Sequence, residues 1–412
     1  MKKKFFLFSI IIVIVISFIL IINTYKKSNQ IKSEEKLAYI NDIKEAYSKY
    51  VITTKESNLY DSKHNIIGKI NKGVKISLKD KNIESEVDDY FELEKFENHF
   101  IFYKDIKPTD SLDPIDTSHK RYLVFNENCT TTDKTRFYDK YFNFLYEINK
   151  SVNLPIYIKE QDYYGVDYAG ELLYLKKDDV EVITAQNTTE QNAKDIPVLL
   201  YHFFHDHNRY ESLSTVISMR ADKFDDQIKY LTENNYMTLK MKDLEYYLDG
   251  KVQIQEDSVC ITIDDGNDSV YIYAHPIIHK YFANATVFAI TSQNEHSIDF
   301  ADDLLEIHSH THDMHKTGYT SVGQGGLFQI IDHDSGVLDL KKSRELLNGS
   351  EYLAYPFGEY TDSSIQIAKD AGIKMAFTTE WRNAKVGDDK YKVPRKYMYN
   401  EYSLEKFIEL IK

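Results

Sequence analysis

The sequence predicts an α/β domain with a parallel sheet or barrel in the C-terminal half of the chain, preceded by small β-rich modules and an apolar N-terminal helix. Segments typical of strands and of helices alternate after residue 196, which is the pattern of a parallel sheet. Short runs of β-branched and aromatic residues between turn residues dominate residues 51–183. With 412 residues, the chain is long enough for two or three domains.

The apolar N-terminal run is Phe5–Ile22, which only Ser9 and Ser17 interrupt. This length is enough for a helix to cross a bilayer. Because no small-residue cleavage pattern follows it, we expect an uncleaved transmembrane signal anchor over residues 1–23. The N-terminus would lie inside and the bulk of the chain outside. The charged residues 24–50 predict a helical stalk, since apolar residues recur in them every three or four positions.

An internal repeat occupies the β-rich region. Leu59-Tyr60-Asp61 recurs 78 residues later as Phe137-Tyr138-Asp139, and Ile70–Val74 recurs as Ile148–Val152 at the same offset. The repeat predicts two small β-barrels over residues 51–110 and 120–183. They resemble bacterial SH3-like domains, which commonly occur in cell-wall proteins, although the tryptophans usual in that family are missing. Binding of the wall and a spacer role are both compatible with this pattern.

Composition limits the possible partners. A formal net charge of -14 argues against a nucleic-acid partner and leaves a neutral glycan possible. The 33 tyrosines offer aromatic surface that could stack on sugar rings, although most tyrosines in sheets only pack. The two cysteines, Cys129 and Cys260, fall in different predicted domains, so we expect no disulfide framework.

The α/β domain is predicted over residues 196–412, after a polar linker. We expect its first strands and helices in the following order: strand 198–201, helix 221–234, strand 259–263, helix 271–282 and strand 285–290.

Two adjacent carboxylates, Asp264 and Asp265, follow the apolar strand that begins at Val259, and Gly266 follows them. Active sites of α/β proteins are built at the carboxyl ends of parallel strands. Because neighbouring side chains there point in different directions, one carboxylate can bind a cation while the other acts as a base. The alternative is an Asp-Gly turn that only ends the strand.

Four histidines fall within eight residues of a segment that begins with the apolar residues Leu304, Leu305 and Ile307. They are His308, His310, His312 and His315. Neutral imidazoles, together with a carboxylate from another strand end, suit a catalytic divalent cation that keeps open positions for water and substrate. A structural or adventitious cation site is the alternative.

Three motifs together resemble the polysaccharide deacetylase (NodB-homology) family, carbohydrate esterase family 4. They are Thr262-Ile263-Asp264-Asp265-Gly266, Ser309-His310-Thr311 with His315, and Ala354-Tyr355-Pro356-Phe357-Gly358. The resemblance covers about residues 196–412. It implies a distorted (β/α) barrel with fewer strands than a TIM barrel. It also implies removal of N- or O-acetyl groups with the help of a divalent metal.

The resemblance implies roles for individual residues. Asp264 would be the general base, Asp265, His310 and His315 the metal ligands, and the backbone N–H of Phe357 an oxyanion donor. His308 and His312 meet the commoner histidine spacing of the family. The five-residue spacing of His310 and His315 fits the branch of poly-N-acetylglucosamine deacetylases, and we favour this pair, with His312 at the rim.

Two departures from the family pattern point to further residues. Leu353-Ala354-Tyr355, and not the arginine usual in the family, come directly before the Pro-x-Gly motif, and no histidine follows His333 to act as the acid. In the poly-N-acetylglucosamine branch the domain is permuted and a Tyr-His after the first strand supplies the acid. The resemblance therefore implies His202 as the general acid. The alternative is a histidine at a strand end whose hydrogen bonds have only a structural role. Arg395 could replace the missing arginine and orient Asp264.

The expected function is metal-dependent N-deacetylation of N-acetylglucosamine residues in a cell-surface polysaccharide. The SH3-like pair favours peptidoglycan, which we rank first, whereas the catalytic branch favours the biofilm exopolysaccharide poly-N-acetylglucosamine, which we rank next. An O-acetyl esterase, or a non-catalytic glycan-binding protein on a decayed esterase fold, would be the alternative. Two imidazoles and one carboxylate suit Zn²⁺, with Co²⁺, Ni²⁺ or Mn²⁺ as substitutes. We expect the domain outside a cell membrane that the N-terminal helix spans once.

Overall fold

The computed structural model describes residues 27, 30, 34, 50–79, 89–96, 98–184, 192–206, 217–318 and 325–412. These residues form parts of two compact units. Unit 1 comprises the chain up to Thr117 with Asn128–Pro155 and Asp162–Ile183, and unit 2 comprises Ser118–Glu127, Ile156–Gln161 and Thr184–Lys412. The boundaries expected for two SH3-like domains and a deacetylase domain stay a prediction.

The predicted anchor over residues 1–23 and almost all of the predicted stalk lie outside the described residues. Among the residues that are described, no helix combines the length and the apolar character that crossing a membrane requires.

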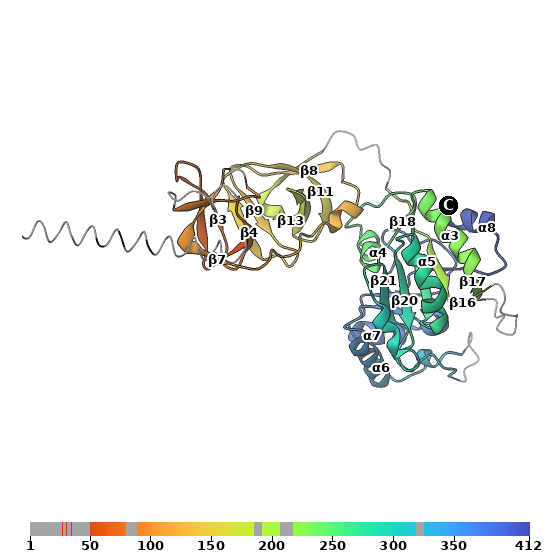
Figure 1. Cartoon of the computed structure of the whole chain (residues 1–412). Coiled ribbons are helices and arrows are strands. Elements are labelled where there is room, and N and C mark those ends of the chain that lie inside the picture. Colours follow the sequence, from red (N-terminus) through yellow and green to blue (C-terminus); the bar gives the residue numbers. More distant parts are fainter. Residues whose placement is uncertain are drawn as a thin grey trace, which may run out of the picture. The chain divides into compact units, whose positions relative to one another are not determined.

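Unit 1 is built from short antiparallel strands, shown in orange to yellow in Figure 1. One sheet has the order β4-β1-β7 and the other the order β14-β8-β11-β12-β13-β9-β10-β3-β2-β6-β5. The strands are β1 (Tyr50–Thr53), β2 (Ser57–Tyr60), β3 (Ile66–Ile70), β4 (Lys75–Ser77), β5 (Tyr90–Glu92), β6 (Phe100–Phe102), β7 (Ile106–Pro108), β8 (Glu127–Thr130), β9 (Thr135–Tyr138), β10 (Phe144–Ile148), β11 (Asn153–Lys159), β12 (Tyr163–Tyr168), β13 (Glu171–Lys176) and β14 (Glu181–Thr184).

The internal repeat is visible in the turns of unit 1. The carboxylate of Asp61 accepts hydrogen bonds from the backbone of residues 63 and 65, and the carboxylate of Asp139 accepts the equivalent bonds from residues 141 and 143. Equivalent strands of the two copies also pair with each other. In the antiparallel pairing of β3 with β10, Lys69 lies opposite Glu147, its own equivalent in the second copy. Both copies therefore share one continuous sheet, and the SH3-like assignment stays a prediction.

Unit 2 contains the predicted α/β domain, and the predicted class is confirmed. Its main sheet has the order β23-β22-β21-β20-β19-β15-β24, with β18 beside β19, and every pairing in it is parallel. The strands are β15 (Val198–Tyr201), β16 (Phe203–His205), β17 (Ser218–Arg220), β18 (Met237–Thr238), β19 (Ser258–Asp265), β20 (Ala285–Ala289), β21 (Leu305–Ser309), β22 (Tyr352–Ala354), β23 (Met375–Phe377) and β24 (Lys396–Tyr397).

Helices cover the outside of this sheet (Figure 1). Helix α3 packs against α5 and α8, while α6 packs against α7 and β21. The helices are α3 (Ala221–Glu233), α4 (Met241–Leu248), α5 (His275–Lys280), α6 (His333–Leu346), α7 (Asp362–Asp370) and α8 (Leu404–Ile411), and a π-helical turn, Val270–Ala274, precedes α5. The predicted helix 271–282 is therefore shorter and begins with this wider turn. Apolar side chains from β15, β19, β20 and β21 form one core with α3, which fixes the strand ends that carry the candidate site.

The sheet curves into an incomplete barrel, because its two edges approach the same segment. Strand β24 pairs with β15, and just before it Val393 forms a single parallel bridge with Phe377 of β23. The backbone N–H of Thr378 also donates to the carbonyl of Val393 at 2.8 Å. This segment brings Arg395 to the interior of the domain, where it is completely buried.

Candidate active site

The adjacent carboxylates end strand β19, as the sequence predicts. All positions of β19 except the last are buried, so the strand is fixed on both faces and Asp264 lies inside the domain at 3% exposure. Asp265 adopts a positive φ of 73°, and Gly266 follows with a φ of 71°. A Cβ at residue 266 would lie 2.9 Å from the Cβ of Ala289, so only glycine fits this turn.

Arg395 holds Asp264 in a bidentate ion pair. Its two terminal nitrogens lie 2.7 and 2.8 Å from Oδ1 and Oδ2 of Asp264, and its Nε donates to the carbonyl of Thr378 at 2.9 Å. Burial opposes ionisation of Asp264, but Arg395 and the nearby His310 outweigh it and lower the pKa of this carboxyl to about 2. Asp264 is therefore ionised and fixed in orientation. The structure brings Arg395 to the residue that it was predicted to orient.

Asp265, His310 and His315 converge next to this ion pair. Nε2 of His310 lies 3.6 Å and Nε2 of His315 lies 3.8 Å from Oδ1 of Asp265. One donor atom from each residue lies within 4.8 Å of the other two. Strands β19 and β21 are separated only by β20, so their carboxyl ends place these groups at one edge of the sheet.

The chemistry of these three groups fits a divalent cation. Nδ1 of His310 lies 2.8 Å from the carbonyl oxygen of Ala354 and donates to it, which leaves Nε2 with a free lone pair toward Asp265. Oδ1 of Asp265 is buried and accepts no hydrogen bond. Burial, followed by repulsion from Asp264, raises the pKa of Asp265 to about 7. A bound cation would neutralise the negative charge of this buried oxygen. Two imidazoles with one carboxylate form a set of ligands that suits zinc.

His202 lies directly after β15 and is half-buried. Its ring stacks on Tyr397, with centroids 5.8 Å apart and planes 6° apart, and its Nδ1 is buried without a hydrogen-bond partner. Burial lowers the pKa of His202 to about 4, while the charge of Asp264 acts in the opposite direction. The charge of Asp264 raises the pKa of His202, and that of His315 lowers it.

Phe357 follows β22 and contacts the same cluster. Its backbone has φ 61° and ψ 7°, a conformation that aromatic residues rarely adopt, and its ring lies 4.4 Å from that of His315. Asp265, Thr311 and Phe357 all have positive φ, and each is a site residue or directly follows one. Such strained backbone is found most often at active sites and ligand clamps.

The other two histidines of the cluster make separate contacts. Nδ1 of His308 lies 3.0 Å from Oγ of Ser350, and Nδ1 of His312 lies 3.0 Å from Oγ1 of Thr291. Among the described residues, neither joins a group of three possible cation ligands. The geometry thus favours His310 and His315, the pair preferred from the sequence.

Sequence reasoning missed two supporting residues. The side-chain amide of Asn294 donates to the backbone carbonyl of Asp265 at 2.8 Å and holds the strained turn. Tyr397 supplies the stacking surface of His202. No motif marks Asn294, whereas Tyr397 could have been noticed two residues after Arg395.

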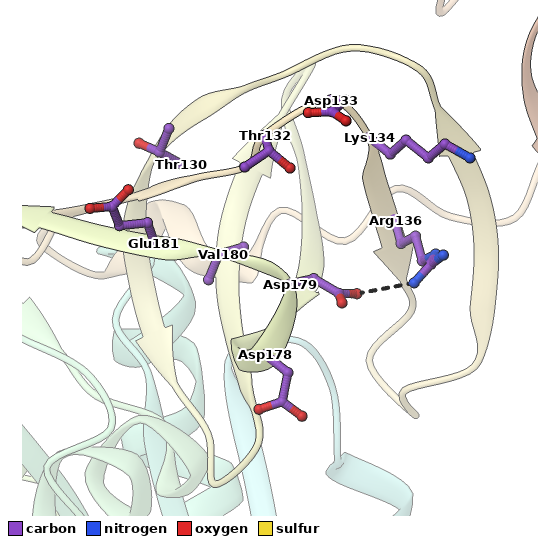
Figure 2. A pocket seen from close by; sticks show the side chains of 9 residues that line it. All are labelled: Thr130, Thr132, Asp133, Lys134, Arg136, Asp178, Asp179, Val180 and Glu181. Carbon is purple, nitrogen blue, oxygen red and sulfur yellow. Dashed lines mark ion pairs between the residues drawn. The ribbon is translucent and has the colours of Figure 1, made fainter.

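A separate pocket of about 460 Å³ lies in unit 1 (Figure 2). Its cations already have partners, since Lys134 and Arg136 lie 3.5 and 2.8 Å from the carboxylate of Glu147. Arg136 also pairs with Asp179 at 3.7 Å, as the dashed line in Figure 2 shows. None of the predicted site residues lines this pocket.

The fold and the site define a class of protein. It is an α/β domain that carries, at one edge of its parallel sheet, a buried carboxylate–arginine pair and three side chains that can hold a cation. The polysaccharide deacetylase family model matches residues 251–376. The chain therefore contains a polysaccharide deacetylase domain, and the enzymes of that family hydrolyse carbon–nitrogen bonds of amides. His202 and Arg395 lie outside the matched residues, so their place in the site rests on the structure.

Named relatives are similar to part of the chain. Poly-beta-1,6-N-acetyl-D-glucosamine N-deacetylase of Staphylococcus aureus is 29% identical over 197 residues, which cover 43% of this chain and 67% of the relative. The protein of the same name from Staphylococcus epidermidis is 29% identical over 205 residues, which cover 45% and 69%. Among solved structures, IcaB from Ammonifex degensii is 23% identical, has a TM-score of 0.47 and covers 54% of this chain and 99% of its own.

Proposed function

We propose that this chain is a metal-dependent N-deacetylase that removes acetyl groups from N-acetylglucosamine residues of poly-N-acetylglucosamine. The observation that carries the proposal is the convergence of Asp265, His310 and His315 beside the buried pair of Asp264 and Arg395. The relatives that bear this substrate in their names support poly-N-acetylglucosamine over peptidoglycan, which the sequence alone ranked first.

Asp265, His310 and His315 would hold the cation, for which zinc suits the donor set best. When bound, a divalent cation polarises the substrate carbonyl and lowers the pKa of water. Asp264 accepts the proton of the attacking water, because Arg395 keeps this carboxylate ionised and fixes its direction. The carboxylate oxygens keep lone pairs beyond those that Arg395 occupies, so the base remains competent.

Attack of the water oxygen converts the acetyl carbon to a tetrahedral centre with a negatively charged oxygen. The backbone N–H of Phe357 donates to this oxygen, and the strained backbone at this position fixes the direction of the donor. The protonated imidazole of His202 gives its proton to the sugar nitrogen as the carbon–nitrogen bond breaks, and because burial lowers the pKa of His202 this proton is readily released. The products are acetate and a glucosamine unit with a free amine.

His202 can be tested with two leaving groups. In His202→Ala, we expect hydrolysis of the acetamide to fall about 100-fold, because an amine leaves only with a proton. Hydrolysis of an aryl acetate should fall less than threefold, since a phenolate leaves without one. Acetate release from both substrates by the same preparation measures the difference. Equal losses on the two substrates would assign His202 a structural role instead of the role of an acid.

The substrate is tested by offering the purified full-length chain poly-N-acetylglucosamine and intact peptidoglycan at equal acetyl content. We expect acetate release from poly-N-acetylglucosamine to be at least tenfold faster, with free amines appearing in equal number. Removal of divalent cations with a chelator should stop the release, and Zn²⁺ should restore it. Faster release from peptidoglycan would overturn the substrate assignment and leave the amidase assignment intact.

The same proposal includes the position of the enzyme in the cell. Residues 1–23 would anchor the chain in the cell membrane, with the deacetylase domain on the extracytoplasmic side, where such a polymer is accessible. The predicted SH3-like pair would then space the domain from the membrane or contact wall glycan.

A further inference from the structure

A second group of two histidines and one aspartate lies away from the candidate active site. His275 and His279 occupy positions i and i+4 of α5, so both side chains lie on one face of the helix. Their Nε2 atoms lie 3.2 and 2.8 Å from the same oxygen, Oδ2 of Asp302. The two rings are 4.4 Å apart and inclined by 67°. Three side chains that can bind a cation, two from α5 and one from the turn before β21, therefore converge on one point.

The carboxylate of Asp302 is fixed in this orientation by the turn before β21. Its Oδ1 accepts the backbone N–H groups of Leu304 and Leu305 at 2.8 and 2.9 Å, so Oδ2 is left to face the imidazoles. These bonds and the two histidines lower the pKa of Asp302 despite partial burial, so it is ionised. Phe300 forms a wall beside His275, with ring centroids 6.0 Å apart. A fixed, ionised ligand with a defined neighbouring wall is what a cation site needs.

We propose that His275, His279 and Asp302 form a second site for a zinc-type divalent cation, with a structural and not a catalytic role. One donor atom from each residue lies within 4.8 Å of the other two. Ligand bonds of about 2.0–2.2 Å let a single ion span donors up to about 4 Å apart, so a small outward movement of the side chains admits it. The side chains are 24%, 43% and 33% exposed, so water can reach the remaining coordination position.

The lysine next in sequence to this group already pairs with a different carboxylate. Lys280, next to His279, pairs with Asp225 at 2.7 Å, and the hydroxyl of Tyr281 donates to the same carboxylate at 3.1 Å. No lysine or arginine among the described residues is paired with Asp302, whose ion pairs involve only the two histidines. An ion at this position would thus meet a carboxylate that no fixed positive charge neutralises.

The position in the fold sets the role. Asp302 precedes β21, whereas His310 follows it, so the second site and the candidate active site lie at opposite ends of this strand. Five strand residues at about 3.3 Å each separate them by roughly 16 Å. A cation at the second site would tie α5 to the start of β21 and would stabilise the folded domain, since the site does not exist in the unfolded chain.

Zinc binding to the purified, metal-stripped full-length chain tests the proposal, with free Zn²⁺ set by a coloured chelator. We expect two equivalents for the parent chain, one for His275→Ala with His279→Ala, one for His310→Ala with His315→Ala, and none when all four are replaced. His296→Ala is the matched control, because His296 pairs with Asp268 at 2.9 Å and belongs to neither group. This control should keep two equivalents.

Two further measurements keep the test valid if a double variant folds poorly. Asp302→Asn retains an acceptor for the two backbone N–H groups and should weaken the second equivalent at least tenfold. Zinc should also raise the midpoint of thermal unfolding of His310→Ala with His315→Ala, and should not do so in the fourfold variant. A single equivalent in the parent chain, or two in the His275 and His279 variant, would show that these imidazoles only share a hydrogen-bonded carboxylate.

Discussion

Asp264→Asn is expected to lower acetate release by about 10²- to 10⁴-fold without loss of a zinc equivalent, because it removes a proton acceptor that is not a cation ligand. Asp265→Ala is expected to abolish release and to lose one zinc equivalent. The two side chains are adjacent in sequence, yet Asp264 faces Arg395 and Asp265 faces His310 and His315. Acetate release and zinc titration of the same preparations measure both effects.

Far-ultraviolet circular dichroism and thermal unfolding of both variants serve as the control for folding. Asparagine at position 264 presents an amide nitrogen to one terminal nitrogen of Arg395 and leaves this buried guanidinium without its counter-charge, so a clear fall in the unfolding midpoint is expected. The base assignment fails if Asp264→Asn hydrolyses poly-N-acetylglucosamine at the parent rate. The ligand assignment fails if Asp265→Ala retains every zinc equivalent of the parent chain.

The core of the candidate site could be predicted from the sequence because it follows from local patterns. A buried strand that ends in Asp264-Asp265-Gly266 and another that ends before His310 must, in a parallel sheet, present these groups at one edge. The order β21-β20-β19 satisfies that expectation with one strand between them. The spacing already favoured His310 and His315, and the structure adds the contacts of each ring, because the sequence alone does not show where a strand ends and its side chains turn.

The contributions of Arg395 and Asp302 depend on contacts between distant parts of the chain. Arg395 lies 131 residues after Asp264 and reaches it only because the segment before β24 bridges to β23. His275 and His279 have helical spacing in the sequence, but their carboxylate comes from a turn that follows β20 in the chain. The pairing of β3 with β10 could not be predicted from the repeat either. A sequence repeat predicts two similar modules, but it does not show which of their strands pair with each other.

Arg395→Met should have the largest effect on stability. The substitution removes the charge, retains much of the apolar stem and leaves Asp264 buried and unpaired. Breaking a buried pair by removal of one partner costs about 3–5 kcal/mol. We expect a loss of this size in the free energy of unfolding at neutral pH, measured by denaturant titration. Turnover should also fall at least 100-fold, because Asp264 loses its orientation and its ionised state.

The pH dependence and a double variant separate this cause from simple loss of packing. The pKa of Asp264 is about 2 in the folded chain, against an ordinary value of 3.8, so the pair stabilises the fold above pH 4. The stability difference between the parent chain and Arg395→Met should therefore be largest at neutral pH and shrink as the pH falls towards 2. Arg395→Met with Asp264→Asn carries no unpaired charge and should be more stable than Arg395→Met alone. If the double variant is no more stable and the difference is independent of pH, the loss comes from packing and Arg395 does not act through the charge of Asp264.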